Sequence, residues 1–358
     1  MTDNSVSLLL GIDVGTTGTK TVLMDENGVL LASAYKGYKT YRDKPNHAEQ
    51  DAEDWWDAVV YTVRGCIQKL DNKDAIKGIS LSTQGASLLP VDNKGKPLAR
   101  AILWMDRRGV NEANKLAEGR GKDYFYLKTG WRMGGALGLV QLQWIKDNNP
   151  VLFKSLHKYI STVEYINFKL TGRFCGDPVN AGISMFLNVK EKKWDKDILD
   201  ILVIGEERLS ELVESGEPIG KLCPDAAEEL GLPGDVMVVS GGHDQYCAAL
   251  GAGAFNDGDV FLSTGTAWVV VGIFDRILFD TGTYYSPGNH VVKGKYGAIA
   301  SFTTGGAGME WIRDTFGIRY DDRNGGSEVE SFRSIDENAA KIPPGSGGIM
   351  LFPHYTGA

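Results

Sequence analysis

Residues 8–24 read LLLGIDVGTTGTKTVLM, and this stretch limits the architectures that the chain can adopt. A short apolar run leads into a turn of Gly and Thr residues, and a second run with β-branched Thr21 and Val22 leads out. The pattern predicts a β-hairpin whose tight loop exposes backbone N–H groups and hydroxyls together. Such a loop suits a phosphate, because Gly lets the backbone approach closely and Thr hydroxyls add donors.

Two better-known glycine motifs fit this stretch poorly. The dinucleotide fingerprint and the Walker loop both place their glycines between a strand and a helix. Here residues 21–24 favour a strand, and Asn27-Gly28 signals a further hairpin turn. The residue before Lys20 is Thr19, where the Walker motif needs Gly. A Gly-rich turn that binds nothing stays open for this loop taken alone.

A second stretch repeats the plan. Residues 259–271 read DVFLSTGTAWVVV, an apolar run, a Thr-Gly-Thr turn and another apolar run. Two similar hairpins in two halves of a chain predict duplicated domains whose loops face one another across a cleft. Loops placed in that way would grip the phosphates of a nucleotide from both sides.

Composition narrows the class of protein. The 358 residues are enough for two domains, and 42% hydrophobic with 23% charged residues is ordinary for a globular protein. The formal net charge of −8 argues against broad nucleic-acid binding. The four cysteines are scattered, which predicts a reducing, cytoplasmic compartment without disulfides or a zinc site. No segment approaches transmembrane length, so no membrane association is expected. A homodimer is one assembly open to the chain.

The remaining pattern predicts an α/β protein. An apolar stripe at helical spacing predicts a core helix over residues 51–70, with acidic residues in its first turn. The other expected elements are strands at 29–34, 76–82, 88–92, 101–105, 236–239, 298–302 and 349–352, mostly helical structure at 123–170, short helices at 194–230, helices at 309–316 and 329–340, and a polar loop over 177–186.

Polar residues directly after strands are candidates for chemistry, because α/β proteins bind ligands there. Asp106 and Arg107 follow the strand at 101–105, and a helix-terminal carboxylate with a surface ion pair is the structural alternative. Asp244 follows Gly241-Gly242 at a predicted helix start and is the best general-base candidate. Its structural alternative is an N-cap aspartate. His243 is interpreted as a hydrogen-bonded wall residue.

Five motifs resemble, in order, those of the FGGY carbohydrate kinases of the sugar kinase/actin/Hsp70 superfamily, with a xylulose kinase-like pattern. They are the first phosphate motif at 11–20, a sugar-contacting strand end at 104–108, the catalytic segment at 241–245, the second phosphate motif at 263–266 and a nucleotide-contacting turn at 305–308. The resemblance implies two actin-like (ribonuclease H-like) domains around a cleft, at 1–246 and 247–358. It also implies that the second domain is incomplete, because the family's adenine-binding segment normally lies beyond the point where this chain ends.

The resemblance implies roles position by position. Asp244 would be the general base that accepts the proton of a sugar hydroxyl, and Asp13 would help to hold Mg²⁺. The residues that would contact ATP are Asp13, Gly15, Thr16, Thr17 and Lys20 in the first half and Thr264, Gly265, Thr266, Gly306 and Glu310 in the second. The residues that would line the sugar pocket are Gln84, Trp104, Asp106, Arg107 and Gln245.

The sequence departs from the family pattern in two places. Xylulose kinases usually show Gln-Met-His-Gly where this chain has Gln84-Gly85-Ala86-Ser87, and Gln141 stands where the first signature usually has Lys. We therefore expect ATP-dependent phosphorylation of a small sugar or polyol, with a ketopentose such as xylulose as the first candidate. A non-catalytic sugar- or nucleotide-binding regulator is the alternative, and an ATPase that drives a partner's conformation ranks last.

Overall fold

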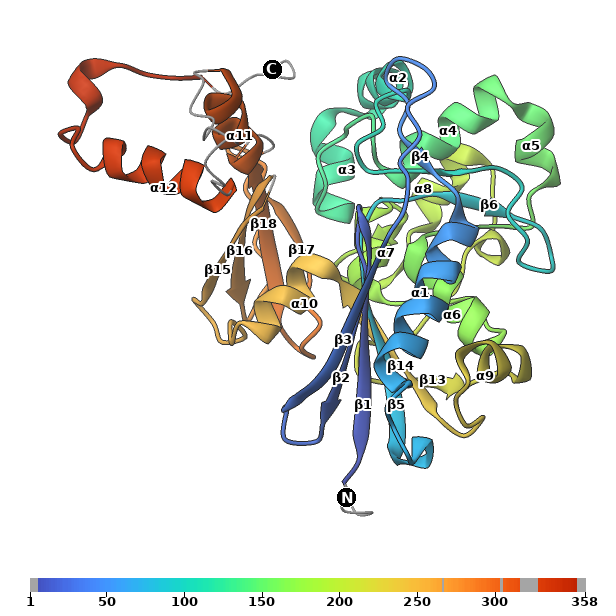
Figure 1. Ribbon diagram of the computed structural model, residues 1–358. Coiled ribbons are helices and arrows are strands. Elements are labelled where there is room, and N and C mark those ends of the chain that lie inside the picture. Colours follow the sequence, from blue (N-terminus) through green and yellow to red (C-terminus); the bar gives the residue numbers. More distant parts are fainter. Residues whose placement is uncertain (1–5, 266, 303–304, 316–327, 353–358) are drawn as a thin grey trace. The chain divides into compact units, whose positions relative to one another are not determined.

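The computed structural model describes residues 6–265, 267–302, 305–315 and 328–352, and it is of the mixed α/β type (Figure 1). The chain forms two compact units. Unit 1 comprises Met1–Asp259 and Gly272–Ala298, and unit 2 comprises Val260–Val271 and Ile299–Ala358. The domain boundary that the sequence suggests at 246/247 stays a prediction.

Unit 1 is organised by a six-stranded sheet in the order β13-β14-β5-β1-β2-β3. The strands span Leu8–Val14 (β1), Gly18–Asp25 (β2), Leu30–Gly37 (β3), Ile76–Thr83 (β5), Pro218–Lys221 (β13) and Met237–His243 (β14). β1 and β14 both run parallel to β5, whereas the other neighbours pair antiparallel. The carboxyl ends of β1, β5 and β14 therefore meet at one edge of the sheet.

The first hairpin and the strand after it are confirmed. β1 and β2 pair antiparallel, with Asp13 opposite Lys20 and Val14 opposite Thr19. A turn at Gly28, whose φ is +81°, then leads into β3. Gly18 is required by close packing, since a Cβ there would lie 2.6 Å from the Lys36 carbonyl oxygen on β3.

The predicted core helix is confirmed as α1, Ala52–Ile67, which lies against β1, β2 and β3 (Figure 1). Asp51 caps it, because its Oδ1 accepts from the Glu53 N–H at 3.1 Å. Trp55, Val59 and Val63 on its inner face are fully buried in the core of this unit. Each such side chain stabilises the fold by about 1.5–3 kcal/mol relative to exposure.

The rest of unit 1 consists of short elements. The helices are α2 Val110–Arg120, α3 Lys122–Thr129, α4 Gly138–Asn148, α5 Pro150–Ser155, α6 Thr162–Thr171, α7 Pro178–Ile183, α8 Lys196–Leu202, α9 Pro224–Leu230 and α10 Asp244–Gly251. Four small antiparallel or parallel pairs join β4 Glu49–Gln50 to β7 Ala101–Ile102, β6 Leu89–Val91 to β8 Lys158–Ile160, β9 Cys175–Gly176 to β12 Glu211–Leu212, and β10 Leu187–Asn188 to β11 Lys193–Trp194.

Two expectations about the strands of this unit need correction. The strand expected at 101–105 ends at Ile102, because Trp104 and Met105 form a turn. The segment 194–230, expected to hold only short helices, also supplies β13, an edge strand of the central sheet. A four-residue strand with Pro at its start carries too little alternation to be recognised locally.

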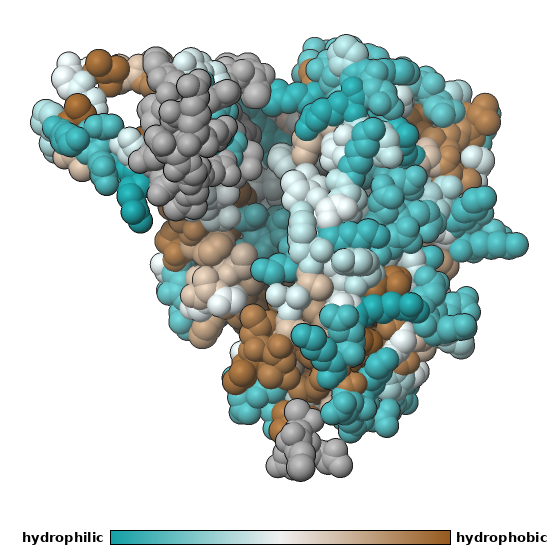
Figure 2. Space-filling model, viewed as in Figure 1, coloured by the Kyte–Doolittle hydropathy of each residue, from teal (hydrophilic) through white to brown (hydrophobic). Residues whose placement is uncertain are grey.

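The visible face of this unit is mostly hydrophilic (Figure 2). Hydrophobic residues gather on its lower part, where the β2–β3 hairpin lies in Figure 1, and Val29, Leu30 and Leu31 are exposed there. No helix in the described ranges is both long and apolar enough to cross a lipid bilayer.

Unit 2 carries the second hairpin. A sheet in the order β15-β16-β18-β17 contains β15 Val260–Thr264, β16 Trp268–Phe274, β17 Ser286–Asn289 and β18 Tyr296–Phe302, and the unit boundary crosses β16 and β18. The neighbouring strands β15 and β16 confirm the hairpin, and α12 Glu328–Ala339 confirms the second expected helix. α11 Gly305–Thr315 confirms the first but begins before residue 309, so residues 305–308, expected as a turn, are helical. The buried strand expected at 349–352 is wrong, since these residues form no strand and Phe352 is 70% exposed.

Residues 177–186, expected as a polar loop, form a buried helix instead. Asp177 caps α7, its Oδ1 accepting from the N–H groups of Val179 and Asn180 at 3.0 and 2.8 Å. Pro178 occupies the first helical turn, where its fixed φ suits a helix. The dipeptide Asp-Pro was thus a helix start signal that the polar composition concealed. Burial raises the pKa of Asp177 to about 6.

This carboxylate makes stability depend on pH. Because its folded pKa lies above the unfolded value, the folded state holds a proton that the unfolded state releases, and stability falls as the pH rises through about 4 to 6. Asp177→Asn keeps the capping oxygen and removes the titration. We expect the stability lost between about pH 4 and 7 to shrink by about 3 kcal/mol. Urea unfolding across that range measures the change, and an unaltered pH slope would contradict it. A smaller slope will persist, because burial also raises the pKa of Glu164.

Candidate active site

The loop between β1 and β2 turns its carbonyl oxygens back into unit 1. Each carbonyl of residues 15–18 accepts a hydrogen bond: Gly15 from the Tyr38 hydroxyl, Thr16 from Gln50 Nε2 at 2.7 Å, Thr17 from the Tyr38 N–H at 3.2 Å, and Gly18, the first residue of β2, from the Gly15 N–H at 3.1 Å. Carbonyl dipoles would repel a phosphate, so holding them back favours an anion on the other side of the loop.

Unlike the carbonyls, the N–H groups of Thr16 and Thr17 remain available as hydrogen-bond donors. Neither donates a hydrogen bond to any residue in the described part of the chain. The Thr16 hydroxyl accepts from Trp104 Nε1 at 3.1 Å, which brings a predicted sugar-pocket residue beside the predicted phosphate loop. The loop therefore offers two free backbone donors of the kind that bind phosphate oxygens.

The edge formed by β1, β5 and β14 gathers three further polar side chains. Asp13 on β1 pairs in register with Ser82 on β5, and Ser82 pairs with Gly242 on β14. Ser82 Oγ donates to Asp13 Oδ1 at 2.6 Å. Asp244 begins α10 directly after β14. Strand order alone thus places the predicted metal ligand and the predicted base at the same edge of the sheet.

Several groups at this edge of the sheet raise or lower the pKa of the Asp13 carboxyl group. Burial raises the pKa of Asp13, the Ser82 hydrogen bond lowers it, the nearby Asp244 carboxylate raises it and Lys20 lowers it. Two carboxylates close together and partly desolvated favour a shared cation or proton. Lys20, opposite Asp13 on β2, is an exposed cation at the same place.

A cavity of 610 Å³ opens on this face of the sheet, opposite the face that α1 covers. Asp13, Lys20, Ser82 and Cys247 are among the residues that line it. A volume of this size accommodates a small ligand, since ligand pockets commonly measure about 300–1,000 Å³.

Asp244 has the environment of a proton acceptor. His243, not Asp244, is the residue that precedes α10, and no side-chain hydrogen bond caps this helix, so the N-cap alternative does not hold. Asp244 Oδ1 is buried and has no hydrogen-bond partner in the described residues, although the side chain as a whole is 30% exposed. His243 Nε2 lies 3.2 Å away without forming a hydrogen bond, and burial lowers the pKa of His243. The imidazole is therefore neutral near pH 7 and does not neutralise the carboxylate.

Two amide oxygens beside Asp244 also lack partners. Gln245 Oε1 and Gln84 Oε1 are buried and make no hydrogen bond to any residue that the structure describes. A buried polar atom without a partner is costly, so it signals a water or ligand site. Gln84 follows β5, at the same edge as Asp244.

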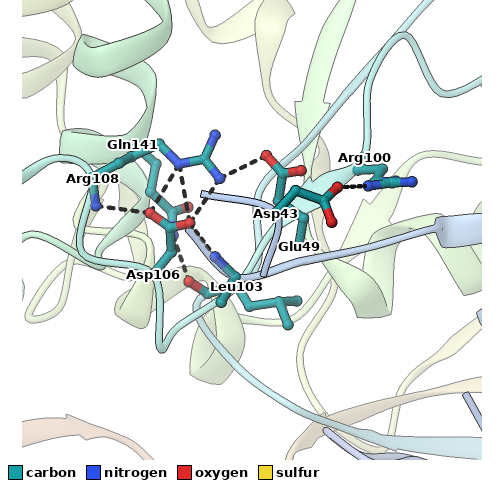
Figure 3. Close-up of polar contacts among 8 residues, drawn as sticks. Asp43, Glu49, Arg100, Leu103, Asp106, Arg108 and Gln141 are labelled. Atoms are coloured by element: carbon teal, nitrogen blue, oxygen red, sulfur yellow. Dashed lines mark hydrogen bonds and ion pairs between the residues drawn. The ribbon is translucent and has the colours of Figure 1, made fainter. Parts of the chain in front are cut away.

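Asp106 is held differently from what the sequence suggests (Figure 3). It is fully buried, and its oxygens accept from the Ala48 N–H at 2.6 Å and from Arg108 Nη2 at 2.7 Å. Arg108 also pairs with Glu49 at 2.6 Å. Asp106 thus joins two segments of the chain and has no surface left for a sugar, whereas the Arg107 side chain is exposed.

Unit 2 carries the predicted nucleotide-side residues. The Gly306 N–H donates to the Gly265 carbonyl at 3.1 Å, which joins the second loop to the start of α11. Thr264 and Glu310 are exposed, and Thr266 lies outside the described residues. Whether this loop faces residues 15–18 stays a prediction.

Sequence reasoning missed three residues that shape this site. Tyr38, Gln50 and Ser82 lie in or beside strands and act through side chains that contact segments distant in sequence. Gln50 carried one weak signal in the sequence, because it is a polar residue directly before a helix N-cap. In the structure its side chain is fully buried.

The comparisons with known proteins agree with this geometry. Residues 8–251 match the N-terminal domain of the FGGY family of carbohydrate kinases. The chain belongs to this family. It is 30% identical over 355 residues to the xylulose kinase of Staphylococcus epidermidis, covering 98% of this chain and 68% of that protein.

Two solved structures from Lactobacillus acidophilus resemble this FGGY kinase equally well. Gluconate kinase matches with a TM-score of 0.89 and 30% identity, covering 99% of this chain and 69% of the other. Ligand-bound xylulose kinase also gives a TM-score of 0.89 and 30% identity, covering 98% and 69%. The predicted family and α/β fold class are confirmed, and the chain is a sugar phosphotransferase.

The Ser82 hydrogen bond gives a test of the Asp13 environment. Ser82→Ala removes a bond that lowers the pKa of Asp13, so that pKa should rise. Because an ionised Asp13 is the form that attracts a cation, the acid limb of the kcat/KM profile should move to higher pH.

Ser80→Ala is the matched control, since Ser80 lines the same cavity two residues away and makes no hydrogen bond to Asp13. Its pH profile should coincide with that of the unchanged protein. An acid limb that stays in place in Ser82→Ala, or that moves equally in both variants, would contradict the role given to this hydrogen bond.

Proposed function

We propose that this kinase transfers the terminal phosphoryl group of ATP to a hydroxyl of a small neutral sugar or polyol, with a ketopentose such as xylulose as the first candidate. The observation that carries the proposal is the unpartnered Asp244 oxygen at the sheet edge that also holds Asp13. In this proposal Asp244 is the general base.

The transferred phosphoryl needs positioning and charge neutralisation more than covalent help. The free N–H groups of Thr16 and Thr17, with Gly15 and Lys20, suit the phosphates of ATP on one side. From unit 2 we assign Thr264, Gly265, Thr266, Gly306 and Glu310 to the nucleotide.

Asp13 fits a magnesium ion, because a partly buried carboxylate whose pKa is raised by burial gains from a cation beside it. Mg²⁺ usually keeps several waters and is held by one or two protein carboxylates, so a single carboxylate such as Asp13 would suffice. When bound, Mg²⁺ would neutralise charge on the phosphates.

The chemical step assigned to the protein is a single proton transfer. Asp244 takes the proton of the sugar hydroxyl while the hydroxyl oxygen forms the new bond to the terminal phosphorus of ATP. The bond from that phosphorus to the ADP oxygen breaks in the same step. The carboxylate then returns the proton to solvent. His243, neutral because burial lowers its pKa, leaves Asp244 free to accept.

The sugar pocket is assigned to Gln84, Trp104 and Gln245. Trp104 is 41% exposed and can cover an apolar sugar face, while the unpartnered oxygens of the two glutamines can accept hydroxyl hydrogens. Asp106 is left out, because its carboxylate is fully engaged by Ala48 and Arg108, whereas a contact between Arg107 and the sugar stays a prediction.

Gluconate is the second candidate substrate, since a gluconate kinase resembles the chain as closely as a xylulose kinase does. The acceptor oxygens of the pocket favour the neutral ketose, because a carboxylate supplies no hydrogen to them.

The four cysteines are free, which supports a reducing, cytoplasmic setting. A homodimer stays a prediction, for which sedimentation is the direct measurement.

A coupled ADP-release screen over pentuloses, hexuloses, alditols and aldonates tests the proposal. We expect xylulose to give the highest kcat/KM, and gluconate as the best substrate would overturn the choice of a neutral sugar.

In Asp244→Asn we expect kcat to fall by about 10²- to 10⁴-fold, the range for losing general-base help. Sugar binding measured by calorimetry should change little. Turnover close to that of the unchanged protein would remove Asp244 from the mechanism.

A further inference from the structure

Gln50 joins more parts of the candidate site than any motif residue does. It lies on β4 directly before α1 and is fully buried. Its Nε2 donates to the Thr16 carbonyl at 2.7 Å and to Thr40 Oγ1 at 2.9 Å. Its Oε1 accepts from Trp55 Nε1 at 2.9 Å and from Gln84 Nε2 at 3.0 Å. All four hydrogen-bonding positions of the amide are therefore used.

The chemistry of its partners fixes which way this amide points. An indole N–H can only donate, so the atom facing Trp55 must be the amide oxygen. A backbone carbonyl can only accept, so the atom facing Thr16 must be the amide nitrogen. A flipped amide would break both bonds at once, and the orientation of Gln50 is unambiguous.

The orientation of the Gln50 amide also determines that of the Gln84 amide. Because Gln50 Oε1 can only accept, Gln84 must present its Nε2 to it, and its Oε1 is left as the free end. Gln84 is almost fully buried, at 1% exposure, and this oxygen accepts no hydrogen bond from any residue that the structure describes. Sugar hydroxyls are such donors, whereas a carboxylate is not.

The segment that carries Gln50 is itself clamped. β4 pairs with β7, the Ala48 N–H is held by Asp106, and Arg108 ties Asp106 to Glu49 (Figure 3). Asp106, which the sequence suggested for the sugar pocket, and Arg108 thus hold the backbone on which Gln50 lies. Rigid support of this kind is what a side chain needs to keep others in register.

We propose that Gln50 is a positioning residue that holds the Thr16 carbonyl away from the phosphates and sets Gln84 as a hydrogen-bond acceptor for a sugar hydroxyl. The inference rests on the proposed function, since it takes residues 15–18 as the phosphate loop and Gln84 as part of the sugar pocket. Gln50 itself touches neither substrate in this proposal.

Two substitutions distinguish the contact of Gln50 with the phosphate loop (the phosphate end) from its contact with Gln84 (the sugar end). When ionised, the side chain of Gln50→Glu keeps an oxygen for Trp55 and Gln84 but loses both donors and adds a negative charge beside the Thr16 carbonyl, so the phosphate end is disturbed most. The assay is run at alkaline pH, because burial raises the pKa of a carboxyl group and its protonated form would still donate. We expect KM for ATP to rise about tenfold or more, with KM for the sugar within about threefold. Gln50→Met removes every bond, so both KM values should rise about tenfold.

Gln141→Met is the matched control. Gln141 is also fully buried, and its Nε2 donates to two backbone carbonyls, those of Leu103 and Ala136 at 3.1 and 2.8 Å. This variant should lose thermal stability as Gln50→Met does while leaving both KM values within about threefold, because it also removes two hydrogen bonds donated by a buried amide, neither of them to residues 15–18 or to Gln84. Control and test variants that raise KM equally would overturn the inference, as would a Gln50→Glu variant with unchanged KM for ATP.

A readout without turnover separates this inference from the proposed function. The N–H groups of Gly15 and Gln84 are bonded to the Gly18 and Val14 carbonyls beside the loop. In Gln50→Met their hydrogen exchange should accelerate about tenfold relative to the unchanged protein and to Gln141→Met. If no sugar supports ADP release but this acceleration occurs, the proposed function fails while the positioning role of Gln50 stands. Unchanged exchange overturns the positioning role.

Discussion

A short backbone turn can bind phosphate only if its carbonyl oxygens are kept away from it, and unit 1 satisfies that constraint with hydrogen bonds from several directions. Tyr38 and Gln50 hold the carbonyls of Gly15 and Thr16, and the turn itself holds that of Gly18. The free donors of Thr16 and Thr17 are the consequence. In unit 2 the Gly265 carbonyl is likewise occupied, by the Gly306 N–H.

The parallel strands supply the second requirement, since they bring acidic groups to the same edge. Asp13 and Asp244 are separated by more than two hundred residues in the chain, yet the Asp244 carboxylate raises the pKa of Asp13, because β1, β5 and β14 lie side by side. Burial and mutual repulsion make this edge a place where a cation and a transferable proton are stabilised. A site assembled from rigid strands holds its groups more closely in position than one built on loops.

The sequence was informative where the physics is local. The hairpin at 8–24 follows from Gly and Thr between β-branched runs, and α1 follows from Asp51 with an apolar stripe at helical spacing. Asp244 could be singled out from its place after a strand. The sequence failed at Asp106, because the Ala48 N–H that its carboxylate accepts from belongs to a distant segment. It also failed at α7, where the local helix-start signal Asp177-Pro178 was not used. Gln50 gave almost no local signal, because its four partners come from different stretches of the chain.

Backbone amide NMR of Thr16 and Thr17 during titration with a non-hydrolysable ATP analogue and Mg²⁺ is the most direct measurement of the central claim. The account predicts that these two resonances move farthest among those of unit 1, because their N–H groups acquire acceptors only when the phosphates bind. Saturable binding of the analogue that leaves both resonances in place would contradict it.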